Sequence, residues 1–179
     1  MTTMSIRQPI RELFEPFMRQ RNAIVLARAA FDPSQEPLAA LELNPALQRQ
    51  IVEHLRGSLP NEGCGLLAVH ADRENEAVYY YPGENLDESP NRYTMNPTAV
   101  IAAFRHMEAR NWRLGAIVHS HPRTAATPSK TDLREAHYPS ALMVICSFAS
   151  AEPELRAWAI TPRDGGLAQV LDERPIVAK

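Results

Sequence analysis

The sequence is short of cysteine and glycine, and it has no long run of apolar residues or of one charge. Its 179 residues include 2 cysteines and 7 glycines, beside 15 prolines. Two cysteines are too few for a disulfide framework. So little glycine argues against a collagen-like or linker-like chain. The excess of proline over glycine indicates many fixed turns, as expected for a compact folded domain.

The balance of charge excludes further classes of protein. The 19 basic and 21 acidic side chains give a formal net charge of −2, and no lysine or arginine run provides the basic surface typical of nucleic-acid binding. No apolar stretch approaches the roughly 18 residues of a membrane span, and no apolar segment typical of an export signal follows Met1. We therefore expect a cytoplasmic protein that binds neither nucleic acid nor membranes.

The length and the distribution of prolines predict one domain preceded by an extension. Residues 1–40 contain four prolines and a predicted helix between Glu15 and Ala30. We can assign this extension no role. Residues 41–179 carry the sharper structural signals, and we expect them to form the domain.

Hydrophobic periodicity predicts two main helices and about six strands in this domain. Each helix is expected to begin at an Asn–Pro pair, after Asn44 and after Asn96, because asparagine caps helices and proline fits their first position. A short helix is expected from Ser129 to about Ala136. Strands are expected at residues 41–43, 64–70, 77–81, 114–119, 141–148 and 155–160, with a further one at 167–171. This order predicts an α/β (α+β) fold, in which helices flank a mixed sheet.

Two histidines at the end of an apolar strand carry the strongest chemical signal. His119 and His121 lie two positions apart, so their side chains point to the same face of the strand, and Pro122 stops the strand behind them. Two neighbouring imidazoles can hold one metal ion between them, although two histidines capping a strand in solvent would show the same pattern. The remaining histidines are interpreted from their local context as structural or solvated: His54, His70, His106 and His137.

A hydrolytic metal site also needs a third ligand and a general base. Catalytic zinc usually takes three protein ligands and a water, and Asp132 follows the second histidine by eleven residues. Ser129 and Asp132 also resemble a helix capping box, a role that does not exclude metal binding. Glu62 is the best candidate for the base, since Gly63 and Gly65 allow close backbone approach beside it. Alone, Glu62 would be an ordinary turn carboxylate.

Taken together, these residues resemble the signature of the JAMM (MPN-plus) zinc metalloproteases. That signature has the form E…H-[S/T]-H-x7-S-x-x-D. Every position is filled at the family's spacing, by Glu62, His119, Ser120, His121, Ser129 and Asp132. The resemblance covers about residues 41–170 and implies a JAMM/MPN-like (cytidine-deaminase-like) sandwich.

The resemblance also implies a role for each residue. His119, His121 and Asp132 would bind one zinc ion, with a water as the fourth ligand. Glu62 would be the general base, and Ser129 would stabilise the oxyanion of the tetrahedral intermediate. Ser120 is interpreted as structural. The two cysteines, Cys64 and Cys146, lie within apolar strands and are left outside the site.

Among JAMM proteases the chain resembles the smaller prokaryotic members, because it is short and shows no ubiquitin-binding module. This implies a protease or isopeptidase acting after the C-terminal Gly-Gly of a ubiquitin-like or sulfur-carrier protein, whose tail would lie extended beside the sheet. Residues 85–91 and 93–95 are candidates for the substrate groove. A non-catalytic MPN scaffold and a zinc hydrolase of a small-molecule amide remain alternatives, and no feature of the sequence indicates the oligomeric state.

Overall fold

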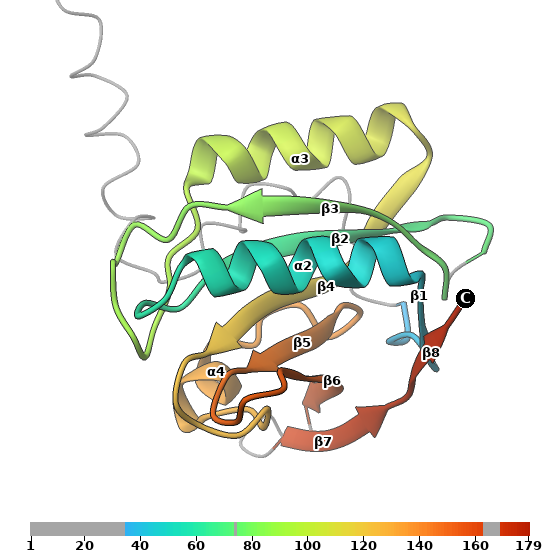
Figure 1. Ribbon diagram of the computed structural model, residues 1–179. Coiled ribbons are helices and arrows are strands. Elements are labelled where there is room, and N and C mark those ends of the chain that lie inside the picture. The colour runs from blue at the N-terminus through green and yellow to red at the C-terminus, as the bar shows by residue number, and fades with distance from the viewer. Residues whose placement is uncertain (1–34, 74, 163–168) are drawn as a thin grey trace, which may run out of the picture.

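The structure is a computed structural model that describes residues 35–73, 75–162 and 169–179. A mixed sheet runs through its centre. The strands are β2 (Cys64–His70), β3 (Ala77–Gly83), β4 (Trp112–His121), β5 (Leu142–Ser147), β6 (Glu154–Pro162) and β7 (Gln169–Arg174). They lie in the order β3–β2–β4–β5–β6–β7 (Figure 1). Among these six described strands, only β4 and β5 are parallel neighbours. The predicted mixed sheet is therefore confirmed.

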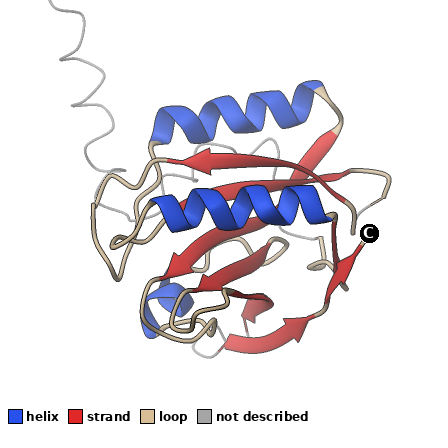
Figure 2. Ribbon diagram, in the orientation of Figure 1, coloured by secondary structure: helices blue, strands red, loops and turns tan. Residues whose placement is uncertain are grey.

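Two long helices cover the two faces of this sheet. They are α2 (Pro45–Gly57) and α3 (Pro97–Ala109), drawn in blue in Figure 2. Leu67 and Val69 of β2 share a buried cluster with α2, whereas Leu66 and Ala68 share one with α3. Because successive strand residues point to opposite faces, the helices lie on opposite sides of the sheet. The domain is thus the predicted sandwich of helix, sheet and helix.

Both long helices begin as their Asn–Pro pairs predict. The side-chain oxygen of Asn44 accepts a hydrogen bond from the backbone N–H of Leu47 at 2.9 Å. That of Asn96 accepts one from the backbone N–H of Thr98 at 3.0 Å. In each case proline occupies the first turn, where its missing N–H leaves no unmet donor.

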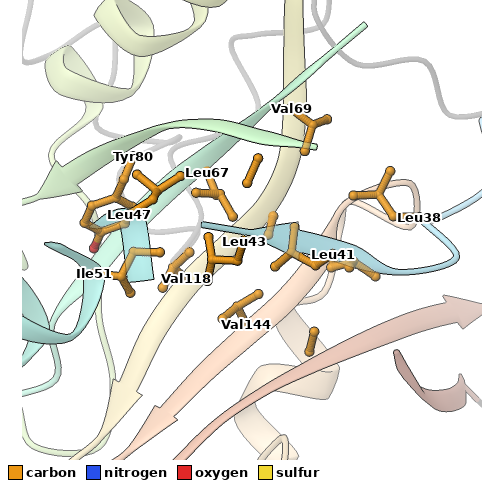
Figure 3. Packing of buried hydrophobic residues seen from close by; sticks show 14 of the residues in the cluster. Leu38, Leu41, Leu43, Leu47, Ile51, Leu67, Val69, Tyr80, Val118 and Val144 are labelled. Atoms are coloured by element: carbon orange, nitrogen blue, oxygen red, sulfur yellow. The ribbon is translucent and has the colours of Figure 1, made fainter. Parts of the chain in front are cut away.

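A second, two-stranded sheet closes the domain. In it the predicted strand β1 (Leu41–Leu43) pairs in parallel with β8 (Ile176–Ala178), a strand that was not predicted from the sequence. Leu41 and Leu43 are almost fully buried. Figure 3 shows both within the main core, beside Val144 of the sheet. Leu38 belongs to the same core, so the described chain packs against the domain from this residue on.

Several strands extend beyond their predicted ends. β4 reaches His121, since β5 continues to pair with it as far as Ser147, and β3 runs two residues further than predicted, to Gly83. The short helix α4 (Lys130–Glu135) follows β4 and lies near the ends of β4 and β5 in Figure 1. The end of β4, with His119 and His121, therefore lies at the same edge of the sheet as the start of α4.

The predicted helix between Glu15 and Ala30 lies outside the described residues. The division of the chain at about residue 40 stays a prediction. Among the helices that the structure describes, none is long and apolar enough to cross a membrane.

Candidate active site

The three predicted metal ligands meet at the end of β4. Their ligand atoms all lie within 4.8 Å of one another. The Nε2 atoms of His119 and His121 are 3.2 Å apart. The Asp132 carboxylate approaches them with Oδ1 at 3.5 Å from His119 Nε2 and Oδ2 at 3.4 Å from His121 Nε2. His119 is fully buried, and the side chain of Asp132 is 10% exposed. The prediction that these side chains come together is confirmed.

A backbone hydrogen bond orients the second histidine. Nδ1 of His121 lies 2.7 Å from the carbonyl oxygen of Ala125. Because a carbonyl only accepts, Nδ1 carries the hydrogen, and the lone pair of the neutral ring remains on Nε2. Metal-binding histidines usually have their other nitrogen held in this way.

The carboxylate of Asp132 is held at the start of α4. Its Oδ2 accepts a hydrogen bond of 2.7 Å from the backbone N–H of Ser129, while the Ser129 hydroxyl oxygen accepts one of 3.2 Å from the backbone N–H of Asp132. These two bonds form the expected capping box. The two interpretations of Asp132 therefore coexist, since the capping carboxylate also reaches both histidines.

The electrostatics of the cluster favour an ionised carboxylate. Burial by itself would raise the pKa of Asp132, but its contacts with His119, His121 and Ser129 outweigh burial and hold that pKa well below its usual range. For His121, burial lowers the pKa, while Asp132 and the Ala125 carbonyl outweigh burial and raise it. The ionised carboxylate of Asp132 therefore favours binding of a cation next to it.

Glu62 lies two residues before β2, within electrostatic reach of His121 and Asp132, and is 6% exposed. Burial raises the pKa of its carboxyl to about 7; His121 opposes that rise and Asp132 adds to it. A carboxylate with a pKa near neutrality is suited to general-base catalysis. The structure therefore brings the predicted base to the predicted ligands.

The backbone around Glu62 is fixed to the strand that carries the histidines. The Gly63 N–H donates to the Ser120 hydroxyl at 2.8 Å, and the Ser120 N–H donates to the Gly63 carbonyl at 3.0 Å. Ser120 stands between the two histidines, so these bonds set the distance between base and ligands. They agree with the interpretation of Ser120 as structural.

A set of contacts from the segment after β3 was not predicted from the sequence. The side-chain amide of Asn85 donates to the Glu62 carbonyl at 2.9 Å, and the Glu62 N–H donates to the Ser89 carbonyl at 2.8 Å. The ring of Tyr93 stacks on His119, with centroids 5.0 Å apart and planes 25° apart. No spacing in the sequence distinguishes these residues from their polar neighbours.

Comparison with known proteins establishes the family. The family model described as prokaryotic homologs of the JAB domain matches residues 44–161, which include all the residues of this site. The chain belongs to this Prok-JAB family. The match confirms the predicted family, and with it the predicted fold.

Relatives of this Prok-JAB chain include two named proteases. The CysO-cysteine peptidase of Mycobacterium tuberculosis is 32% identical over 132 residues, covering 72% of this chain and 87% of the relative. A probable TtuB-protein conjugate cleaving protease of Thermus thermophilus is 40% identical over 86 residues, covering 48% and 55%. The solution structure of protein DSY2949 from Desulfitobacterium hafniense matches with a TM-score of 0.67 and 33% identity, covering 78% of this chain and 92% of that one. The predicted peptidase class is confirmed, and these relatives do not favour the non-catalytic scaffold.

The two glycines beside Glu62 permit the close packing of the Prok-JAB core, as predicted. A Cβ atom on Gly63 would lie 2.9 Å from the side chain of Leu55. One on Gly65 would lie 2.5 Å from the Tyr80 hydroxyl and 2.6 Å from the Tyr81 carbonyl oxygen. Both positions require the absence of a side chain.

The other candidate residues of the Prok-JAB domain stay outside the cluster. The Nδ1 atoms of His54 and His106 lie 2.8 and 2.7 Å from tyrosine hydroxyls, which agrees with their structural interpretation. Cys64 and Cys146 are buried free thiols. Burial raises the pKa of each to about 12, so both remain protonated at neutral pH.

A cavity of about 520 Å³ opens beside Glu62. It lies between the second half of α2 and the segment that follows β3, with Asn61, Asn85 and Glu88 among its lining residues. Part of the candidate groove segment 85–91 therefore lines a cavity that reaches the predicted base.

Proposed function

We propose that this chain is a zinc-dependent protease or isopeptidase that cleaves after the C-terminal Gly-Gly of a ubiquitin-like or sulfur-carrier protein. The buried cluster of two imidazoles and one carboxylate beside Glu62 is the observation that carries the proposal. The substrate class is supported by relatives whose names refer to CysO-cysteine and to TtuB-protein conjugates.

The donor set fits a zinc ion. Two imidazole nitrogens and one carboxylate are ligands that catalytic zinc accepts, with a fourth position left open. With its hydrogen on Nδ1, the neutral ring of His121 can offer its Nε2 lone pair to a metal ion, and the low pKa of Asp132 keeps its carboxylate charged. His119, His121 and Asp132 would hold the ion.

Zinc bound there would lower the pKa of a water molecule and polarise the scissile carbonyl. Glu62 would take the proton of the attacking water, because its pKa of about 7 makes it a proton acceptor near neutral pH. The same carboxyl would then give the proton to the leaving amine.

Ser129 would assist by donating a hydrogen bond to the oxyanion. Its hydroxyl oxygen accepts from the backbone N–H of Asp132, which leaves the hydroxyl hydrogen free for a second partner. Ser129 is exposed at the start of α4, where a substrate carbonyl can approach it. Donors placed in advance for a developing oxyanion are a large source of catalysis.

The requirement for Gly-Gly would come from the width of the path to the metal. Residues without side chains pass a narrow slot, and an extended tail gains affinity from backbone hydrogen bonds. Asn85 and Glu88 line the cavity beside Glu62, which supports residues 85–91 for the part of the path next to the base.

The proposal is tested with sulfur-carrier proteins of the same genome that bear a C-terminal extension, incubated with the zinc-loaded enzyme and read by intact mass. We expect loss of the extension and a product ending in Gly-Gly. A carrier with Ala-Ala in place of Gly-Gly, and an enzyme with His121→Ala, which should lose zinc, are the controls. No cleavage by enzyme holding one zinc per chain would refute the substrate class. Cleavage of small amides alone would favour the small-molecule hydrolase.

A further inference from the structure

The two histidines of the cluster are held in different ways. His121 has its Nδ1 fixed by the Ala125 carbonyl at 2.7 Å. Nδ1 of His119 is buried and has no hydrogen-bond partner within the part of the chain that the structure describes. Metal-ligating histidines are normally oriented by a hydrogen bond at the second nitrogen. His119 therefore needs another contact to set the plane of its ring.

Tyr93 supplies that contact. Its ring lies almost parallel to that of His119, at 25°, with the centroids 5.0 Å apart. A stacked neighbour restricts rotation of the imidazole out of its plane. It also keeps water from one face of the ring.

The backbone on either side of Tyr93 is well anchored. The Thr94 N–H donates to the Asn85 side-chain oxygen at 3.1 Å, and the amide group of Asn85 donates to the Arg92 carbonyl at 3.1 Å. The same amide group donates to the Glu62 carbonyl. One segment thus holds the backbone of the base and presents a flat ring to a metal ligand.

We propose that Tyr93 is a positioning residue of the metal site, which fixes the ring plane of His119 by stacking. This inference rests on the zinc site of the proposed function. The aromatic ring of Tyr93, and not its hydroxyl, would orient the His119 imidazole. Removal of the ring should therefore weaken metal binding, whereas removal of the hydroxyl alone should not.

Three variants separate these contributions. Tyr93→Phe keeps the ring, and Tyr93→Leu removes it while filling much of the space. Tyr79→Leu is the matched control, because Tyr79 also stacks at 25°, on Trp112, but is 43% exposed and belongs to a different aromatic cluster. If Tyr93→Leu does not fold, Tyr93→Met serves in its place.

The first readout is the zinc dissociation constant of the full chain, measured by competition with a chromophoric chelator. Thermal melting of each metal-free protein reports folding separately. We expect Tyr93→Leu to bind zinc about tenfold more weakly, the lower end of the loss typical for supporting contacts of a metal ligand. The zinc dissociation constants of Tyr93→Phe and Tyr79→Leu should stay within about twofold of the parent's value, well below the loss expected when a supporting contact is removed.

The second readout is the visible absorption spectrum of the cobalt-substituted proteins, which reports ligand geometry. Tyr93→Leu should alter this spectrum, and the two other variants should preserve it. Equal zinc affinity in the parent and Tyr93→Leu would overturn the inference, as would equal losses in Tyr93→Phe and Tyr93→Leu. Absence of zinc binding by the parent would instead contradict the proposed function.

Discussion

Replacing Glu62 with glutamine should stabilise the metal-free protein at alkaline pH. The carboxyl is 6% exposed, and its burial raises the pKa from the ordinary value of 4.5 to about 7, with Asp132 adding to the rise. Above pH 7 the folded protein must keep a buried charge that the unfolded chain exposes to water. Glutamine has nearly the same shape and carries no charge, so the variant avoids this cost.

The size and sign of the effect follow from linkage. The difference between 4.5 and about 7, at about 1.4 kcal/mol per pH unit, corresponds to a loss of about 3 kcal/mol. Between these values the folded protein holds a proton that the unfolded chain has released. The stability of the parent therefore falls as the pH rises through this window. Below pH 4.5 both states are protonated and the contribution vanishes.

The assay is urea denaturation in the presence of a chelator at pH 5 and at pH 8. The advantage of Glu62→Gln over the parent should be about 2 kcal/mol larger at pH 8. Glu53→Gln is the control, because Glu53 lines the same cavity but is exposed, and it should change stability little at either pH. An advantage of Glu62→Gln that is the same at both pH values would refute the raised pKa.

Three further predictions concern separate contacts. Ser120→Ala leaves the buried N–H of Gly63 without its 2.8 Å acceptor, so unfolding should become easier by about 1–3 kcal/mol in urea. Ser129→Ala removes a helix cap and the proposed oxyanion donor, so it should lower the free energy of unfolding by about 1 kcal/mol and kcat about 100-fold. Asn44→Ala, which removes only a helix cap, should lose similar stability and keep the parent's kcat. Gly65→Ala would bring a methyl within 2.5 Å of a tyrosine hydroxyl, with an expected loss of about 1–3 kcal/mol in the same urea assay.

The elements that sequence predicts best are those fixed by short-range rules. The caps at Asn44 and Asn96 depend on residues two or three positions away. The pairing of Ser129 with Asp132 spans three positions, and strand alternation places His119 beside His121. Such rules hold wherever the local backbone is regular, and they predicted the histidine pair and the Ser129–Asp132 cap. The assignment of these residues and Glu62 to one site came from the resemblance to the JAMM signature.

Contacts between distant segments could not be predicted from these short-range rules. Asn85 reaches the backbone of Glu62 across 23 positions, and the stacking of Tyr93 on His119 joins a loop to a strand. The pattern around these residues is simply polar. The missed strand β8 is three residues long and mostly exposed, so it shows no alternation between buried and exposed positions. Tertiary packing decides these features.

The most direct measurement of the central claim is the cleavage rate of Glu62→Gln loaded with one zinc per chain. With a Gly-Gly-extended carrier protein as substrate, the parent should cleave, and the variant should hold the same amount of zinc without measurable product. A variant that holds zinc at full occupancy but does not cleave would show that the missing proton acceptor, and not a missing metal, abolishes activity. Cleavage by the variant at the parent's rate would contradict Glu62 as the general base.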